Sequence, residues 1–358
     1  MKNVCFLIGN LNNSGGTERV TTLVANELSK RGGYTISILS LVDGLTPFFS
    51  LNENIKIYSL YKKKISFKNN FFGAIWSIRS FVTKHNIHTL IVVDSISCVF
   101  TVPALWFKSI NHICWEHFHF KNNNGVAYRN FGRKLAAKFC NYVVTLTNKD
   151  IGYWLMGLGK TKAKLINIPN PSPYMTVKNK PNLQYKVVLT VGRLTHVKGY
   201  DLLLQAWADI CVEDKEWQLF IVGGGEEEEN LKKLANKLNI INRVVFAGTQ
   251  NDVSIFYEKS SIFCLSSRNE GLPMVLLEAQ SYGLPIVSFD CDTGPSEIVT
   301  HGENGYLARM GDIGEMSFFL KSLMYSEKNN YISFSESAIN SSKSFHVDNI
   351  INKWCEII

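Results

Sequence analysis

Two glutamates eight positions apart, Glu270 and Glu278, are residues that could do chemistry. They lie in the stretch NEGLPMVLLEAQ (269–280), where Glu278 follows the apolar run 274–277 and precedes Ala279. A carboxylate among so much hydrocarbon must be paired, protonated or hydrogen-bonded, because burying it alone is very costly. A ligand diol, such as the 2′- and 3′-hydroxyls of a ribose, would satisfy its two oxygens. The alternative is a surface helix on which Glu278 is exposed.

The flanking residues indicate where a helix begins and ends in this stretch. Pro273 suits the first position of a helix, where its missing N–H is not needed, and Gly283 suits the position that closes it. Glu270 then lies on the loop before the helix, and Glu278 lies inside it. The start of a helix offers unpaired N–H groups and a partial positive charge, which favour a phosphate or a sugar oxygen.

Two cations could meet a diphosphate in the segment VGRLTHVKGYDLLLQAW (191–207). A strand is expected to end at Gly192, so Arg193 and Lys198 lie on the loop that leads to the next helix. Lysine supplies a point charge, and arginine supplies a planar fork for two oxygens. The alternative is that both side chains are solvated on the surface.

A third loop, NLNNSGGTERV (10–20), places Gly15 and Gly16 ahead of an amphipathic helix. Its spacing does not fit the GxGxxG fingerprint of dinucleotide-binding proteins. Glycines at this place still allow a ligand to approach the backbone closely.

The elements that must position these loops alternate between short β-branched runs and amphipathic segments. Strands are expected at 4–9, 35–41, 88–94, 142–147, 187–192, 219–225, 243–248, 262–267 and 285–290. Strands that alternate with helices predict parallel sheets covered on both faces, hence an α/β fold of two doubly wound, Rossmann-like domains.

The proline-rich stretch 168–184 predicts a linker between the two domains. We expect an N-terminal domain over 1–170, a C-terminal domain over 171–345, and a C-terminal helix over 346–358 that packs back on the first domain. The two sheets would face each other across a cleft, and ligands of open α/β sheets bind outside the carboxyl ends of the strands.

Composition excludes several classes of protein. No apolar run approaches the roughly 20 residues that a membrane span needs. The first residues, MKNVCFLIGN, predict a strand rather than a signal peptide, because asparagines follow without a cleavage pattern. The eight cysteines are scattered singly, without metal-binding spacing, which is typical of reduced thiols in a cytosolic protein.

Charge is distributed unevenly along the chain. Residues 1–170 contain 21 Lys and Arg against 7 Asp and Glu, a net charge of +14, whereas residues 171–358 contain 17 against 23, a net of −6. The first half is therefore expected to face an anionic partner, whether nucleic acid, a lipid surface or a phosphate-bearing substrate.

Taken together, the motifs resemble glycosyltransferase family 4, whose members are retaining enzymes of the two-domain GT-B fold. The stretches VGRLTHVKGYDLL, FIVGGG, FAGTQND, SSRNEGLPMVLLEAQSYGLPIVSFD and TGPSEIVTHGENGYL occur in family order over most of residues 187–310. The first half matches more loosely, through SGGTERV, WEH (115–117) and VVTLTNKD (143–150).

The resemblance implies roles for the residues already singled out. Glu270 would meet the transferred sugar, Glu278 would bind the ribose, and Arg193 and Lys198 would neutralise the diphosphate leaving group. Catalytic roles are thereby implied for Glu270, Arg193, Lys198 and His117, the last of which matches a histidine near the transferred sugar. The alternative for His117 is a core or solvated histidine.

The resemblance also implies further contacts with the donor. The backbone near Gly248 and Thr249 would frame the base, and Gly15 and Gly16 would line the cleft from the first domain. The remaining predicted donor contacts follow Glu270 directly: Gly271, Leu272, Pro273 and Met274.

One short motif favours another fold. Asp290 and Asp292, in the order Asp-Cys-Asp, match the Asp-x-Asp by which GT-A glycosyltransferases hold a divalent ion. Here the motif follows a late strand of a second α/β domain, and Arg193 and Lys198 already supply positive charge. We interpret it as a chance match and expect neither a metal nor another cofactor.

A basic and aromatic segment (60–85) favours a membrane surface as the anionic partner. Its residues predicted to face the membrane are Lys62, Lys63, Lys64, Lys68, Phe71, Phe72 and Trp76. The segment FGRKLAAKF (131–139) adds three more cations. Cations beside exposed aromatic rings suit an anionic bilayer. The alternative is that the rings lie in the core. Stacking on nucleic acid would look similar, but no nucleic-acid-binding module accompanies the segment.

The sequence thus predicts a cytoplasmic glycosyltransferase, peripherally bound to the inner face of the membrane. It would transfer a sugar from a nucleotide-sugar donor, such as a UDP-hexose or UDP-N-acetylhexosamine, to a polyprenyl-diphosphate-linked saccharide in O-antigen or capsule assembly. A nucleotide-sugar epimerase of the same shape and a non-catalytic nucleotide-sugar-binding subunit are the alternatives.

Overall fold

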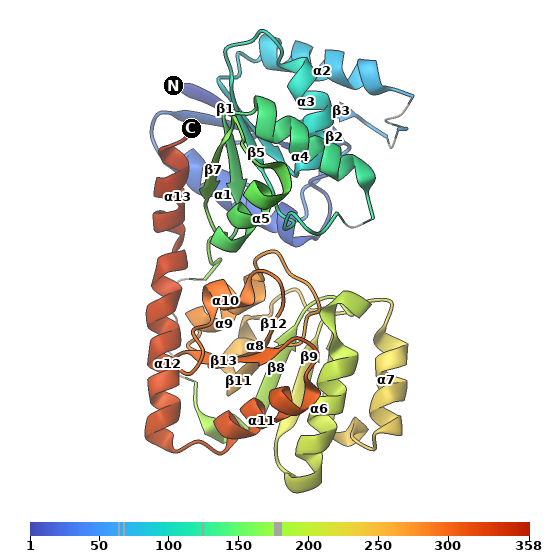
Figure 1. The fold of residues 1–358 in the computed structure, drawn as a ribbon, viewed down its shortest axis with the longest axis vertical. Coiled ribbons are helices and arrows are strands. Elements are labelled where there is room, and N and C mark those ends of the chain that lie inside the picture. The colour runs from blue at the N-terminus through green and yellow to red at the C-terminus, as the bar shows by residue number, and fades with distance from the viewer. Residues whose placement is uncertain (64, 67–68, 124, 175–180) are drawn as a thin grey trace. The chain divides into compact units, whose positions relative to one another are not determined.

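The computed structural model describes residues 1–63, 65–66, 69–123, 125–174 and 181–358. The chain forms two compact units (Figure 1). Unit 1 contains Met1–Pro171 and Val347–Ile358, and unit 2 contains Ser172–His346. Each unit is built on one parallel sheet.

Unit 1 has a seven-stranded sheet in the order β3-β2-β1-β4-β5-β6-β7. Its strands are β1 (Lys2–Ile8), β2 (Tyr34–Val42), β3 (Lys56–Tyr61), β4 (Thr89–Val93), β5 (Asn111–Trp115), β6 (Tyr142–Thr145) and β7 (Lys164–Asn167). Its α-helices are α1 (Gly16–Lys30), α2 (Phe71–Lys84), α3 (Cys98–Ala104), α4 (Ala127–Phe139), α5 (Asn148–Leu158) and α13 (Val347–Cys355).

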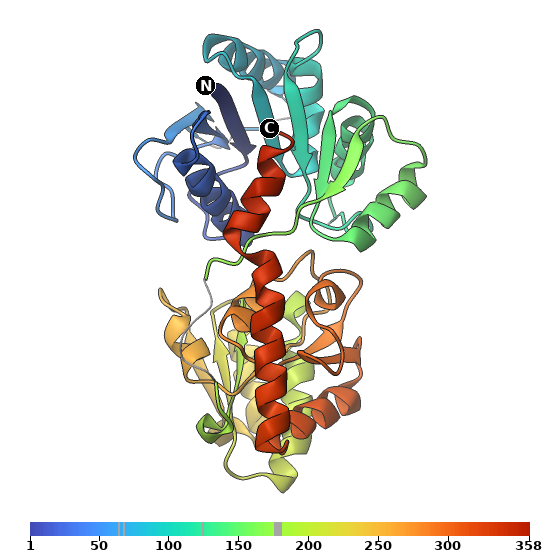
Figure 2. The same cartoon turned by 90° about the vertical axis from the view of Figure 1, so that its left-hand side faces the viewer.

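Both faces of this sheet are buried. Cys5 and Leu7 share a core with residues of α2, α3 and α4. On the other face, Phe6 packs against Trp115, and Trp115 packs against Trp354 of α13 with ring centroids 4.8 Å apart. Both chain termini lie in unit 1, where the Lys2 ammonium donates to the carbonyl oxygen of Ile358 at 3.0 Å (Figure 2).

Unit 2 has a six-stranded sheet in the order β10-β9-β8-β11-β12-β13. Its strands are β8 (Val187–Val191), β9 (Gln218–Val222), β10 (Val244–Gly248), β11 (Ile262–Leu265), β12 (Ile286–Asp290) and β13 (Gly305–Arg309). Its α-helices are α6 (Tyr200–Glu213), α7 (Glu228–Lys237), α8 (Ser254–Glu258), α9 (Met274–Ser281), α10 (Pro295–Ile298), α11 (Ile313–Met324) and α12 (Lys328–Ser342).

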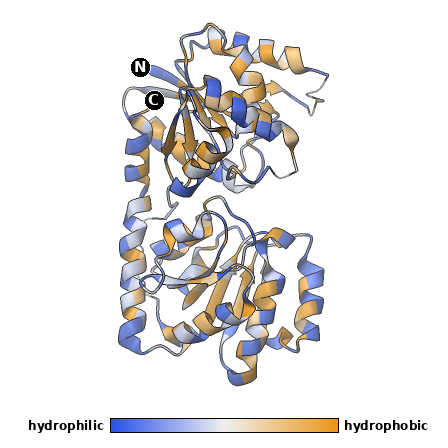
Figure 3. Ribbon diagram, in the orientation of Figure 1, coloured by the Kyte–Doolittle hydropathy of each residue, from blue (hydrophilic) through white to orange (hydrophobic). Residues whose placement is uncertain are grey.

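The strands of both sheets are strongly hydrophobic, whereas the helices mix hydrophobic and hydrophilic residues (Figure 3). This distribution is typical of parallel sheets, because crossover helices bury both faces of each strand. The pattern explains why continuous apolar runs identified the central strands in the sequence. No helix in the described part of the chain combines the length and the apolar character needed to cross a bilayer.

The predicted α/β fold class is confirmed, and all nine predicted strands are present with small shifts at their ends. Four strands were not predicted: β3, β5, β7 and β13. Three of these lie at or next to the edge of a sheet, where less burial permits polar residues. Pro273 was expected to open α9, but it is the residue just before that helix.

Candidate active site

The strand order reverses at the centre of each sheet. In unit 2 this switch point lies between the neighbouring strands β8 and β11. Open α/β sheets bind ligands at such points, because the loops that leave the two carboxyl ends diverge and open a crevice. The two predicted donor loops, 192–199 after β8 and 266–273 after β11, both start there.

An ion pair joins these two loops. The Lys198 ammonium lies 2.6 Å from Oε1 of Glu270, and the two side chains are 27% and 11% exposed. The structure therefore brings together the cation predicted to meet the diphosphate and the carboxylate predicted to meet the sugar. Because both side chains are partly exposed, a ligand can reach the pair.

Residues that were not predicted hold the Lys198 loop in place. Arg268 forms a bidentate ion pair with Asp201 of α6, with N–O distances of 2.8 and 2.7 Å. The Ser266 hydroxyl donates to the Lys198 carbonyl oxygen at 2.9 Å. Gly199 has a φ of 64°, and a Cβ there would lie 2.1 Å from the Ser266 carbonyl oxygen, so glycine is required.

A neighbouring loop fixes the backbone around Glu270. The Thr293 hydroxyl donates to the carbonyl oxygen of Glu270 at 2.7 Å. Leu272 and Pro273 are buried, whereas Gly271 and Met274 are half-buried. The side chains of Leu272 and Pro273 therefore pack inside the unit. A ligand could contact this segment chiefly through its backbone.

Glu278 is completely buried, so its interpretation as an exposed residue of a surface helix is wrong. Its Oε2 accepts a hydrogen bond of 3.0 Å from the hydroxyl of Tyr257. Tyr257 is itself buried and stacks on Tyr282 and Phe263. This tyrosine is one partner of the buried carboxylate, and the sequence offered no signal for it. The contact between Glu278 and a ribose remains a prediction.

Arg193 lies on the same loop as Lys198 but in a different environment. Its side chain is 80% exposed, and its guanidinium is 3.9 Å from the Glu226 carboxylate, which is also exposed. Such a pair contributes little to stability. Arg193 is thus exposed and weakly paired, whereas Lys198 is held by a short ion pair.

The loops after β8, β9 and β10 form one backbone network. The Gly223 N–H donates to the Gly248 carbonyl oxygen at 2.8 Å, and the Leu194 N–H donates to the Gly224 carbonyl oxygen at 3.0 Å. A Cβ on Gly224 would lie 2.7 Å from Oγ1 of the exposed Thr249. The glycines of FIVGGG therefore let the predicted base-binding backbone lie close to the Arg193 loop.

Asp290 is the last residue of β12, Asp292 lies just after the strand, and both are exposed. Neither belongs to a group of three metal-ligating side chains in the part of the chain that the structure describes. Their interpretation as a chance match to the GT-A motif remains a prediction.

In unit 1, His117 follows β5 and packs against Trp115 with ring centroids 4.5 Å apart. Burial lowers the pKa of His117 to about 3, so its imidazole is neutral at ordinary pH. Its Nε2 has no hydrogen-bond partner among the described residues. This nitrogen is itself buried, so contact between His117 and a sugar remains a prediction.

A buried ion pair shapes the loop that carries His117. The Arg133 guanidinium lies 2.9 Å from the Glu116 carboxylate, and both side chains are completely buried. Arg133 also donates to the carbonyl oxygens of Phe120 and Asn122. The sequence suggested that Arg133 adds to a basic surface. This was wrong, because its guanidinium is buried inside the unit and paired with Glu116.

Gly15 and Gly16 lie where the loop after β1 enters α1, next to the switch point of the first sheet between β1 and β4. No side chain caps this helix end. A Cβ on Gly16 would meet nothing within 4 Å, so open space faces this residue.

The predicted membrane-facing residues are partly described. Lys62 and Lys63 are exposed, whereas Lys64 and Lys68 lie outside the described residues. On α2, Phe72 and Trp76 are 82% and 71% exposed, so their interpretation as core residues is wrong. The structure adds exposed rings that were not predicted: Trp106, Phe107 and Phe139. Phe71 is half-buried and packs against Phe72 and Phe100.

Two parallel-sheet units, with charged and glycine-rich loops at the switch points, define the GT-B class of glycosyltransferases. Residues 175–340 match the family described as glycosyl transferases group 1. A glycosyltransferase of Haemophilus influenzae, itself uncharacterized, is 40% identical over 358 residues and spans 100% of both chains. The chain belongs to the group 1 glycosyl transferases and is a glycosyltransferase.

Two further proteins are informative. The first is the α-1,4-N-acetyl-D-galactosaminyltransferase of Campylobacter jejuni, named for an oligosaccharide acceptor on diphospho-undecaprenol. It is 26% identical over 370 residues, covering 100% of this chain and 98% of its own. The second is Anabaena HepE, solved in complex with UDP, which superposes with a TM-score of 0.82 at 19% identity and covers 99% of each chain. The latter likeness establishes the fold alone.

Proposed function

We propose that this chain is a retaining, metal-independent glycosyltransferase of surface polysaccharide assembly, such as that of O-antigen or capsule. Its donor is a UDP-hexose or UDP-N-acetylhexosamine, and its acceptor is a saccharide on a polyprenyl diphosphate. The observation that carries the proposal is the Lys198–Glu270 pair at the switch point of the second sheet, with Glu278 buried on the helix that follows.

The donor binds with its diphosphate over the start of the 192–199 loop. Lys198 then exchanges Glu270 for a phosphate oxygen, and the exposed Arg193 turns to the diphosphate from the same loop. The released Glu270 carboxylate turns to the hydroxyls of the sugar. Glu278 binds the ribose, while the backbone of Gly248 and Thr249 frames the base. HepE, which shares the fold, binds UDP, and this supports UDP as the nucleotide.

The reaction proceeds on one face of the sugar. The bond between the anomeric carbon and the phosphate oxygen breaks as the acceptor oxygen attacks from the same side, and the leaving phosphate accepts the acceptor's proton. This route needs no protein nucleophile, and it suits a site whose residues mainly stabilise negative charge on the leaving group. Positive charge from Lys198 and Arg193 replaces that of a metal ion.

The acceptor side rests on unit 1. Gly15, Gly16 and the neutral imidazole of His117 provide neutral hydrogen-bonding groups for a sugar. The exposed Phe72 and Trp76, beside Lys62 and Lys63, give the unit an amphipathic surface suited to an anionic bilayer. The diphospho-undecaprenol acceptor in the name of the Campylobacter jejuni relative supports a lipid-linked acceptor. We propose that the enzyme meets this acceptor at the cytoplasmic leaflet.

The test is a panel of UDP- and GDP-sugars incubated with the purified protein. Slow hydrolysis of one donor identifies the substrate, and that donor is then offered with a synthetic polyprenyl-diphosphate saccharide. Nuclear magnetic resonance of the product reports whether the anomeric configuration is kept. Isomerisation of a donor without any acceptor would favour an epimerase, and binding without turnover of any donor would favour a non-catalytic subunit. An inverted product would refute the retaining mechanism.

A further inference from the structure

Sulfur and imidazole groups from three distant stretches of sequence meet inside unit 1. The ligand atoms of Cys98, His112 and Cys140 all lie within 4.8 Å of one another, and all three residues are buried. Cys98 is the first residue of α3, His112 lies in β5, and Cys140 directly follows α4. Among the described residues, no other His, Cys, Asp or Glu side chains form such a group of three.

The spacing of these atoms fits a metal ion. An ion at the centre of three atoms so spaced lies no more than about 2.8 Å from each, against about 2.3 Å for a zinc–sulfur bond and about 2.0 Å for a zinc–nitrogen bond. Cys140 Sγ and His112 Nδ1 are 3.5 Å apart. Tetrahedral bonds of those lengths would place a sulfur and a nitrogen about 3.5 Å apart. Only small movements are needed.

Cys114 is the candidate for a fourth ligand, although its sulfur is not part of the group whose atoms already lie within 4.8 Å of one another. Cys114 is two residues after His112, so both side chains point to the same face of β5. Its thiol is completely buried in the same core as Cys98 and Cys140. Three cysteines and one histidine are a ligand set of structural zinc sites, which are closed and tetrahedral.

The histidine is also held as a metal ligand would be. Its Nε2 lies 3.1 Å from the hydroxyl oxygen of Thr101 on α3. When Nε2–H donates to Thr101, the Nδ1 lone pair faces Cys140. A hydrogen bond from the second ring nitrogen is what orients histidine ligands in metal sites.

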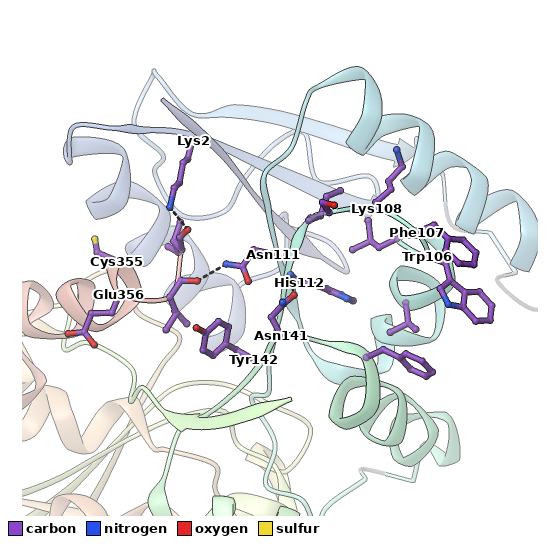
Figure 4. Close-up of a pocket in the computed structure, with 17 residues that line it drawn as sticks. Lys2, Trp106, Phe107, Lys108, Asn111, His112, Asn141, Tyr142, Cys355 and Glu356 are labelled. Carbon is purple, nitrogen blue, oxygen red and sulfur yellow. Dashed lines mark hydrogen bonds between the residues drawn. The ribbon is translucent and has the colours of Figure 1, made fainter. Parts of the chain in front are cut away.

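One residue of the group, His112, also borders a surface pocket. His112 lines a pocket of about 710 Å³ at the edge of unit 1 where β1, β5 and β6 begin (Figure 4). The chain end forms part of its wall, because Asn111 donates to the Ile357 carbonyl oxygen at 2.6 Å. This edge is opposite to the carboxyl ends of the strands, so the pocket is separate from the loops assigned to the acceptor.

We propose that unit 1 binds one Zn²⁺ through Cys98, His112 and Cys140, with Cys114 as the fourth ligand. Each thiol that binds the ion releases its proton to the solvent. Thiolate and imidazole ligands suit zinc better than hard cations such as Mg²⁺. A closed site leaves no position for a substrate, so the ion ties α3 and α4 to the sheet and stabilises unit 1.

The test measures metal in the full-length protein, expressed in zinc-supplemented medium and purified without a histidine tag or chelator. Mass spectrometry of the metal content is expected to give about one zinc ion per chain. Refolding with Co²⁺ should produce the thiolate charge-transfer band and the intense d–d bands of a tetrahedral sulfur site. Cys98→Ala and Cys140→Ala should each lower the zinc content at least tenfold. Cys5→Ala removes an equally buried thiol of the same unit outside the group, and it should leave the content unchanged.

If the two variants do not fold, the wild-type protein still decides the question. Its thermal midpoint should fall after dialysis against a strong zinc chelator and recover when zinc is added back. Wild-type protein with less than about a tenth of an ion per chain and no cobalt spectrum would overturn the proposal. A zinc content equal in wild type, Cys98→Ala and Cys140→Ala would do the same, as would a disulfide between Cys98 and Cys140.

Discussion

The ion pair between Lys198 and Glu270 leads to a quantitative prediction for Lys198→Ala. The pair is partly exposed, so its loss should cost no more than about 1 kcal/mol of folding free energy. In the transition state the same ammonium would face a diphosphate that gains negative charge. A charge-assisted hydrogen bond there contributes about 1.5–3 kcal/mol, and a preorganised donor in a shielded site contributes up to about 4 kcal/mol. One factor of ten in rate corresponds to about 1.4 kcal/mol. We therefore expect the turnover of Lys198→Ala to fall by about tenfold to a thousandfold with the fold intact.

The assay is steady-state turnover of the donor identified by the nucleotide-sugar panel, with circular dichroism to confirm folding. Lys321→Ala is the matched control. Its ammonium lies 2.9 Å from Glu213 and its side chain is 24% exposed, but Glu213 is at the far end of α6 from the switch point. This control should keep wild-type turnover. Arg193→Ala should also lose activity, because its guanidinium is assigned to the same diphosphate.

A double-mutant cycle separates two ways in which Lys198 could act. If Lys198 only holds Glu270 in place, Lys198→Ala combined with Glu270→Gln should be no slower than Glu270→Gln alone. If Lys198 binds the diphosphate and Glu270 binds the sugar, the second substitution should cost further activity. Near-wild-type turnover of both Lys198→Ala and Arg193→Ala would refute the assignment of the diphosphate site.

Three further predictions concern metal, membrane and pH. Turnover should survive brief treatment with EDTA, and Asp292→Asn should be mild; complete loss that Mn²⁺ or Mg²⁺ restores would instead support a metal-bound diphosphate. Changing Lys62 and Lys63 to Ser should weaken sedimentation with anionic vesicles while donor hydrolysis persists. Wild-type binding should weaken steeply as salt is added, because charges more than about 10 Å apart are screened from one another at ~0.1 M salt. Unchanged vesicle binding by the variant would contradict a membrane role for this surface. Burial lowers the pKa of His117 to about 3, so below about pH 6.5 the unfolded chain takes up a proton that the folded chain does not. As the pH is lowered from about 6.5 towards 3, the free energy of unfolding should therefore decrease by up to about 1.4 kcal/mol per pH unit from this residue alone. Urea unfolding of His117→Gln should show a smaller decrease over the same pH range than wild type. Parallel curves for the two proteins would contradict the buried, neutral state.

The sequence by itself determined the fold class and the positions of the loops that carry the predicted donor residues. Parallel strands buried on both faces are continuous apolar runs, so the central strands and their order of appearance could be read directly. A residue that follows a central strand must lie at the carboxyl edge of the sheet, and this placed Arg193, Lys198 and Glu270 at one edge before any contact was known. Gly15 and Gly16 were located in the same way.

Contacts between side chains were decided only by the tertiary structure, because they depend on which elements become neighbours. Lys198 and Glu270 are 72 positions apart, and their pairing follows from β8 and β11 lying side by side. Tyr257, which satisfies Glu278, comes from α8, and no periodicity links the two residues. Arg133 looked like a surface cation, but packing of α4 buried it beside Glu116.

The cysteines show the same division most clearly. Their single, scattered positions predict isolated buried thiols, because metal sites are recognised in sequence by short, regular spacing. Folding brings Cys98, His112 and Cys140 together from a helix start, a strand and a helix end that are separated along the chain by other elements. Sequence determines which residues lie on an apolar face, whereas the packing of α3 and α4 on β5 determines which of those residues meet.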